Sequence, residues 1–246
     1  MLTMFKKLLS ALSGKKEQTP GPAESDYTQA EHVPVPDEEM IVAWDANGRE
    51  IHIARNDWRN RVFLPGLAQK WNNAAELYDA ILSGLNDGFA ADLIPAAARL
   101  VEIDDDPERS HTIQGIVLME NKRLVEAEST LQAGIAKVGA TGTLLTNLAK
   151  VFSHKGDDAR AEELLWQAIE ADPNLDNGLL WWASIKQERQ GEAGYVAGLR
   201  TVAALPGSWR AQLWLARYYL EHSNVAAARA LYDDVLAQGQ IGRAHV

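Results

Sequence analysis

The chain contains no cysteine among its 246 residues. This absence excludes disulfide bonds, thiolate metal sites and a cysteine nucleophile, and it is typical of a reducing compartment. No apolar run approaches the roughly 18 residues of a membrane-spanning helix. Acidic residues outnumber basic ones, 34 against 24, which gives a net charge of −10. Because nucleic-acid binding needs a basic surface, we expect a cytoplasmic protein that binds no nucleic acid.

The sequence also lacks the common catalytic and cofactor motifs. It contains no G-x-S-x-G, G-x-G-x-x-G, G-x-x-x-x-G-K-[ST] or H-E-x-x-H segment. The six histidines show no metal-ligand spacing. Asp104-Asp105-Asp106 lacks the spaced ligands and the glycine of a calcium loop, so we interpret it as a solvated turn. We therefore expect no enzymatic activity, no cofactor and no metal.

The first 39 residues divide into two segments of opposite charge. Residues 1–16 carry four lysines and no acid, and their apolar side chains recur at helical spacing: Leu2, Phe5, Leu9 and Leu12. This pattern predicts an amphipathic helix on an anionic membrane or on a partner, with a frayed tail as the alternative. Residues 17–39 contain seven acids, four prolines and no lysine or arginine. Such a composition predicts a solvated linker.

Residues 40–65 predict a β-hairpin followed by a short connection. In the stretch MIVAWDANGREIHIAR, side chains alternate as in a strand, a turn sequence follows, and the strand-like alternation resumes. Asn47-Gly48 is a favoured pair for a two-residue type I′ turn, and the resulting register pairs Trp44 with Ile51. That register also sets two acids opposite each other, so a four-residue loop from Asp45 to Gly48 is an alternative. Since a lone hairpin is barely stable, we expect it to pack on the first helix that follows.

Residues 66–240 have a helical pattern that repeats about every 34 residues. Within residues 142–175 one helix face carries Leu145, Leu148, Ala149 and Phe152, and a second helix follows the break at Gly156. Small residues recur at equivalent places in the first helices (Gly115, Ala149, Ala183, Ala216) and in the second helices (Ala127, Ala161, Ala228). Small residues at this spacing predict helix hairpins that approach closely and stack on one another.

This order of residues resembles the tetratricopeptide repeat (TPR) family, in which a large-x-x-Leu-small-x-x-aromatic helix precedes an Ala-x-x-x-large helix and a proline. The resemblance is closest for 142–175, good for 209–238 and fair for 108–141. It is weaker for 176–208, where Lys186 takes the aromatic position and Gly194 or Val196 the alanine position, and residues 70–107 look like a degenerate first unit. The resemblance implies an all-α solenoid.

In proteins of this family the first helices of successive repeats line a concave groove that holds extended peptides. The resemblance therefore implies a scaffold that binds a protein or peptide, of acidic or aromatic character. Carried onto this chain, the groove positions give the candidate binding residues Arg109, Thr146, Asn147, Lys150, Asn177, Trp181, Arg210, Trp214 and Arg217. Asn147, Lys150 and Arg217 share the chemistry of the carboxylate clamp found in some members, but the first-repeat pair of that clamp is absent.

Two other functions stay open at this point. The chain is alternatively the N-terminal regulatory or targeting region of a longer, truncated enzyme, or a membrane-peripheral assembly factor tethered by residues 1–16. Truncation is suggested by residues 241–246, because Ile-Gly-Arg-Ala-His-Val is what ATC GGA AGA GCA CAC GTC encodes, a common sequencing adapter. We accordingly expect 241–246 to be an artefact and give His245 no function. The oligomeric state does not follow from the sequence.

Overall fold

The computed structural model describes residues 40–44 and 47–237. The chain separates into two units, Met1–Glu39 and Met40–Val246. The predictions for residues 1–16, 17–39 and 241–246 lie outside the described residues.

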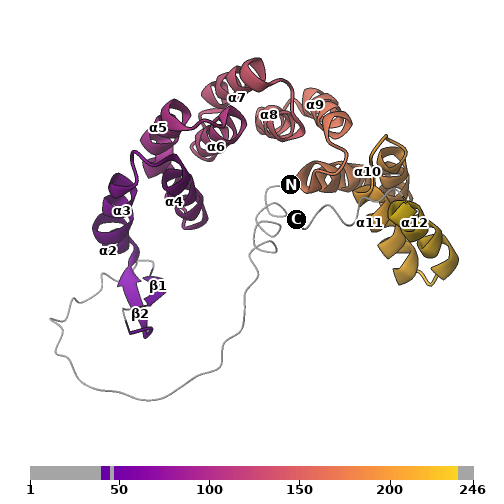
Figure 1. Ribbon diagram of the computed structural model, residues 1–246, viewed down its shortest axis with the longest axis horizontal. Helices are drawn as coiled ribbons and strands as arrows, with labels where there is room; N and C mark the ends of the chain where they lie inside the picture. Colours follow the sequence, from indigo (N-terminus) through magenta and orange to yellow (C-terminus); the bar gives the residue numbers. More distant parts are fainter. Residues whose placement is uncertain (1–39, 45–46, 238–246) are drawn as a thin grey trace. The chain divides into compact units, whose positions relative to one another are not determined.

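The described residues form a short antiparallel hairpin followed by a long series of helices (Figure 1). The strands are β1 (Met40–Trp44) and β2 (Glu50–Ala54). The helices of the first part are α2 (Arg55–Trp58), a π-helical turn (Arg59–Phe63), α3 (Leu64–Gln69), α4 (Ala74–Asn86), a 3-10 turn (Ala90–Leu93) and α5 (Ile94–Ile103). The helices of the second part are α6 (Pro107–Glu120), α7 (Leu124–Val138), α8 (Gly142–His154), α9 (Asp158–Ala171), α10 (Asp176–Ala203), α11 (Arg210–Glu221) and α12 (Val225–Ala237). The predicted fold class is confirmed.

The hairpin has a register that differs from both predicted alternatives. Trp44 pairs with Glu50 and Ala43 with Ile51, so the connection is five residues long. A shift of one residue exchanges the two faces of a strand. Ala43 is accordingly buried, with 5% of its surface exposed, whereas Trp44 is 67% exposed. Both strands contact α2, as expected of a hairpin that needs support.

Residues 55–69 are helical, although we expected a short connection up to residue 65. We attribute this helical conformation to packing of residues 55–69 against residues 89–92 rather than to local helix propensity. The guanidinium of Arg59 donates two hydrogen bonds to the carboxylate of Asp92, with Nε 2.7 Å from Oδ2. The ring of Phe63 stacks on Phe89 with 4.8 Å between ring centroids. These contacts hold the π-helical turn of residues 59–63 against the segment between α4 and α5.

The helix hairpins follow the predicted repeat. α6 packs on α7, α8 on α9 and α11 on α12, and each hairpin contacts the next one along the chain (Figure 1). The small residues lie where the helices approach most closely: Ala149, Ala183 and Ala216 have no exposed surface. A Cβ atom on Gly115 would lie 2.8 Å from the Leu131 side chain. The small positions therefore allow close helix contact, as predicted.

α10 contains a complete helix hairpin without a loop. Gly191 has φ 64° and ψ −153°, a conformation that is essentially restricted to glycine, and it joins the two halves. A Cβ atom on Gly194 would overlap the carbonyl oxygen of Lys186. The stem of Lys186 lies against Gly198, and its ammonium is 3.9 Å from the ring centroid of Trp182. Glycine thus takes the place of alanine in the second helix: Gly194 permits close approach to the backbone of Lys186, and the missing side chain of Gly198 leaves room for the Lys186 stem.

Side chains cap most of the first helices. Asn73 accepts a hydrogen bond from the N–H of Glu76, which confirms the predicted helix start. α11 has no cap of its own and receives one from another unit. Asn174 Oδ1 accepts from the N–H groups of Trp209 and Arg210 at 2.9 and 3.0 Å, while its Nδ2 donates to the carbonyl of Gly207. Asn174, in the segment between α9 and α10, therefore fixes the start of α11.

Candidate partner-binding face

The first helices of successive hairpins lie next to one another. α6 contacts α8, and α8 contacts α10. Where α8 meets α10, a Cβ atom on Gly178 would lie 3.3 Å from Thr146 Oγ1. The absence of a side chain at Gly178 lets α10 approach the polar side of α8. We define the first-helix face as the predicted groove positions of four helices: Arg109 on α6; Thr146, Asn147 and Lys150 on α8; Asn177 and Trp181 on α10; and Arg210, Trp214 and Arg217 on α11.

The centre of this face on α8 is polar but incompletely hydrogen-bonded. Thr146 is 2% exposed and Asn147 is 6% exposed. The Asn147 amide donates through Nδ2 to the carbonyl of Thr143 at 2.9 Å, yet its Oδ1 is buried without a partner. Thr146 Oγ1 and the equivalent hydroxyl of Thr112, 34 residues earlier on α6, are also buried without partners. Such groups are costly to desolvate, and most buried polar groups in proteins have a partner.

Lys150 lies one helical turn beyond Thr146 and Asn147 and therefore shares their face of α8. Its side chain is partly buried, and burial lowers the pKa of its ammonium. The structure thus brings three predicted residues, Thr146, Asn147 and Lys150, together on one helix.

Arg109 has a partner within the chain. Its Nε and Nη2 donate to Asp104 at 2.9 and 2.6 Å, and its guanidinium lies 5.2 Å from the ring centroid of Tyr78. The Asp104 side chain is only 2% exposed, and these hydrogen bonds hold the pKa of Asp104 below its usual value. The interpretation of the three aspartates as a solvated turn is therefore wrong for Asp104. Asp106, in turn, caps α6 by accepting from the N–H of Arg109.

The other two predicted arginines also pair with carboxylates. Arg210 pairs with Asp176 and stacks on the ring of Trp209 at 4.7 Å. Arg217 is exposed and pairs with Glu221 one turn further along α11, with 3.0 Å between Nε and Oε1. These arginines can contact a partner only in competition with carboxylates of the same chain.

The predicted aromatic and amide positions occupy different environments. Trp181 and Trp214 are partly buried and pack against the core of residues 118–215. Each keeps part of its surface exposed, as amphipathic aromatic residues at binding surfaces often do. Asn177, in the first turn of α10, is exposed.

Comparisons with known proteins found similar solved structures and no matching family model. Solved structures that resemble this chain include the TPR protein YrrB, described as having an unusual peptide-binding site (14% identity, 72% of this chain and 91% of that chain, TM-score 0.40). They also include MamA, with 15% identity over 78% of this chain and 98% of that chain and a TM-score of 0.40. A third is Pseudomonas aeruginosa PilF, with 16% identity over 75% of this chain and 78% of that chain and a TM-score of 0.42. No family model matches, and no curated protein matches. The hairpins of residues 107–237, with small buried residues 33 or 34 positions apart, are those of the TPR pattern. The chain is a TPR-like array.

Several features of the TPR-like array were not predicted. The ion pairs of Arg109 and Arg210, the cap supplied by Asn174 and the unpartnered hydroxyl of Thr112 all depend on contacts between helices. Only the spacing of Thr112 and Thr146 could have indicated the shared hydroxyl position. Among residues 40–44 and 47–237, no cluster of three potential metal ligands occurs. In the same part of the chain, no helix is long and apolar enough to cross a membrane.

Proposed function

We propose that the protein is a non-enzymatic cytoplasmic scaffold that binds a partner peptide on the first-helix face, centred on α8. The observation that carries this proposal is the pair of buried, unpartnered oxygens on adjacent residues, Thr146 Oγ1 and Asn147 Oδ1. A fold that served packing alone would favour apolar residues here, because an unsatisfied buried polar atom costs roughly 1–3 kcal/mol. A ligand that supplies the missing hydrogen bonds recovers this cost.

The chemistry of the site favours an extended and acidic peptide. Asn147 Oδ1 is an acceptor that suits a peptide N–H group. Because this oxygen is buried, binding requires the Asn147 side chain to turn outward from Thr143. Lys150 offers a positive charge one turn away, and its charge favours an acidic side chain on the peptide. The exposed edges of Trp181 and Trp214 would add apolar contact further along the face.

The test uses the full chain and a random 12-residue peptide library displayed on phage. The enriched peptide is synthesised, and its affinity is measured by calorimetry for the wild type and for Asn147→Ala and Lys150→Ala. Loss of the charge-assisted hydrogen bond of Lys150, worth roughly 1.5–3 kcal/mol, should weaken binding about 10- to 100-fold, and loss of the neutral hydrogen bond of Asn147, worth roughly 0.5–1.5 kcal/mol, about 2- to 10-fold. The matched control is Lys137→Ala, an exposed lysine on the second helix α7, which should change affinity less than about twofold.

The proposal fails if the enriched peptides bind both α8 variants as tightly as they bind the wild type. It also fails if the Lys137→Ala control weakens binding as much as the α8 variants do. Circular dichroism of each variant establishes that the helices are retained.

The basic segment favours a second role beside peptide binding. Residues 1–16 carry four lysines and no acid, and we propose that they contact an anionic membrane, with residues 17–39 as the tether. Flotation of the full chain with phosphatidylserine vesicles should depend on residues 1–16. Equal flotation without them would remove this role.

A further inference from the structure

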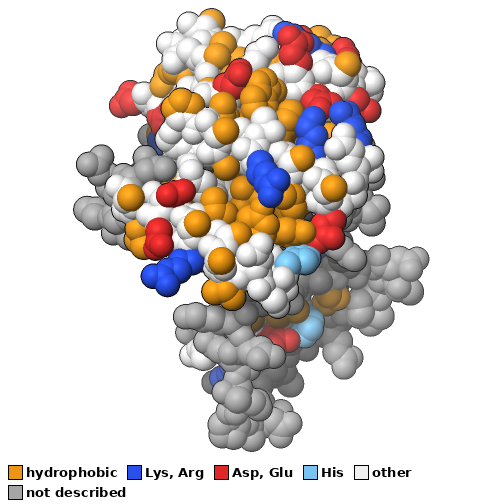
Figure 2. All heavy atoms as spheres, turned by 90° about the vertical axis from the view of Figure 1, so that its right-hand side faces the viewer, with side chains coloured by type: hydrophobic (Ala, Val, Ile, Leu, Met, Phe, Trp, Pro, Cys, Tyr) orange, Lys and Arg blue, Asp and Glu red, His pale blue; other side chains and the backbone are white. Residues whose placement is uncertain are grey.

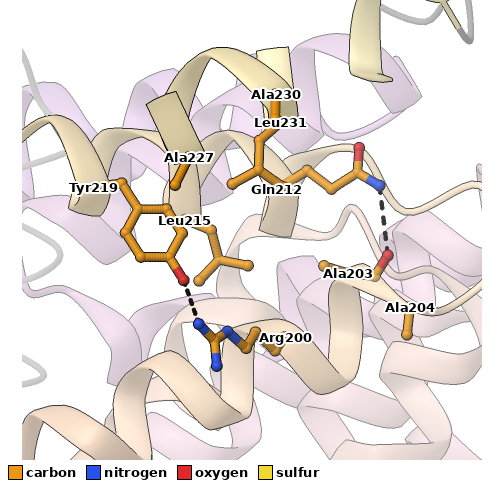
Figure 3. Close-up of a pocket in the computed structure, with 9 residues that line it drawn as sticks. All are labelled: Arg200, Ala203, Ala204, Gln212, Leu215, Tyr219, Ala227, Ala230 and Leu231. Atoms are coloured by element: carbon orange, nitrogen blue, oxygen red, sulfur yellow. Dashed lines mark hydrogen bonds between the residues drawn. The ribbon is translucent and has the colours of Figure 1, made fainter. Parts of the chain in front are cut away.

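A second candidate site lies at the last described hairpin, away from the polar centre of α8. Figure 2 shows the side of the molecule where α11 and α12 lie, with apolar side chains gathered among charged side chains of both signs. A pocket of about 450 Å³ opens between three helices of this region. Its lining comes from the end of α10 (Arg200, Ala203, Ala204), from α11 (Gln212, Leu215, Tyr219) and from α12 (Ala227, Ala230, Leu231) (Figure 3).

The equivalent place in the earlier hairpin of α8 and α9 is filled. The repeat spacing of 67 residues sets Leu145 of α8 at the position of Gln212, and Leu164 of α9 at the position of Leu231. Leu145 and Leu164 are 5% and 3% exposed, so the earlier hairpin closes this place with apolar packing. In the last hairpin a glutamine replaces one leucine, and Leu231 stays partly exposed. Within the described residues the two hairpins therefore differ at this place, in the residue at the Gln212 position and in the exposure of Leu231.

The pocket presents two polar groups on an otherwise apolar lining. Gln212 Oε1 is buried without a partner, although its Nε2 reaches the carbonyl of Ala203 at 3.5 Å. Arg200 is exposed and donates through Nη2 to the hydroxyl of Tyr219 at 2.5 Å, as Figure 3 shows. Among the described residues no carboxylate lies within ion-pair distance of Arg200. A guanidinium that has the Tyr219 hydroxyl but no carboxylate as a partner, and a buried acceptor without a partner, thus flank the same apolar space.

We infer that this pocket binds a segment of a partner protein in which a large apolar side chain stands beside an aspartate or glutamate. The apolar side chain fills the space over Leu215 and Leu231. The carboxylate pairs with Arg200, whose planar guanidinium suits bidentate carboxylate binding. A backbone N–H of the segment donates to Gln212 Oε1. Charge complementarity decides the occupant, because an apolar segment alone would leave Gln212 Oε1 without a donor and would bring no carboxylate to the Arg200 guanidinium.

The experiment selects 12-residue peptides from a random phage library on the full chain and removes those that bind the double variant Arg200→Gln, Ala227→Leu. The second substitution fills the pocket. It is compatible with the helix because the equivalent residue of α9 is the larger Arg160. We expect the enriched peptides to share a large apolar residue within four positions of an acid. Their affinity should fall at least tenfold with either single substitution.

Arg229→Gln is the matched control, since Arg229 is an exposed arginine on α12 outside the pocket lining, and it should change affinity less than twofold. Asn147→Ala should likewise leave this affinity unchanged, which separates the pocket from the site on α8. Enriched peptides without an acid, or no enrichment over the double variant, would overturn the inference. A dimer in sedimentation velocity that dissociates on Ala227→Leu would also overturn it, because the occupant would then be a second copy of the chain.

Discussion

Thr146→Val is expected to stabilise the free protein while weakening its binding of peptide. The substitution keeps the shape of the side chain and removes the unpartnered hydroxyl. Desolvating such a hydroxyl costs roughly 1–3 kcal/mol, and the valine methyl group adds apolar burial. The methyl group takes the place of a hydroxyl of similar size, beside Gly178, where α10 approaches α8 closely. We expect unfolding to become less favourable by about 1–3 kcal/mol.

Thermal unfolding followed by circular dichroism measures this effect. For a domain of this size about 1 kcal/mol corresponds to a rise in Tm of roughly 2–4 °C. Thr143→Val, one turn earlier on α8, is the control and should change stability by less than about 0.5 kcal/mol. If Thr146→Val leaves Tm unchanged or lowers it, the hydroxyl already has a partner, such as an ordered water, and the reasoning is wrong.

Three further predictions concern the scaffold. Asn174→Ala removes three hydrogen bonds at the start of α11 and should destabilise the protein by about 1–3 kcal/mol. Gly194→Ala should cost about 1–3 kcal/mol, because its Cβ atom would overlap a carbonyl oxygen of α10. Burial lowers the pKa of His111, so its stabilising contribution is complete above pH ~6.5 and is lost as the pH falls through the lowered value.

Urea or thermal unfolding measures all three. Gly66→Ala on α3 is the control for Gly194→Ala, because no atom lies within 4 Å of its added Cβ, and it should stabilise by about 0.5–1 kcal/mol. If Gly194→Ala and Gly66→Ala changed the free energy of unfolding equally, the overlap of the Gly194 Cβ with the backbone would not be the cause of destabilisation. Wild type should lose more stability than His111→Gln between pH 7.5 and 5.5, and parallel losses would contradict the assignment. An Asn174→Ala variant as stable as wild type would show that α11 needs no external cap.

The repeat was predictable because packing imposes it directly on the sequence. A small residue is required wherever two helices approach closely, so Ala149 and Ala183 recur at fixed spacing. The unit of 176–208 departs from the pattern for a reason that only the structure shows. Gly194 lets the second helix approach the Lys186 backbone, and the stem of Lys186 uses the space that a side chain at position 198 would occupy.

The errors of prediction come from contacts between distant residues. The hairpin register depends on packing against α2, which alternation and turn propensity do not report. The roles of Arg109 and Arg210 depend on Asp104 and Asp176, which compete with any ligand for these cations. Position in the repeat therefore predicted where a side chain lies but not whether a neighbour already engages it.

Site-directed photo-crosslinking tests most directly whether a partner binds the first-helix face. Because the chain has no cysteine, one introduced cysteine carries a benzophenone label at a unique position. The labels are placed at Asn177→Cys, exposed at the start of α10, and at Ser129→Cys, exposed on the second helix α7. The peptide selected on wild type and weakened by Lys150→Ala should crosslink to position 177 and not to position 129. Crosslinking at position 129, or equally at both, would contradict binding on the first-helix face.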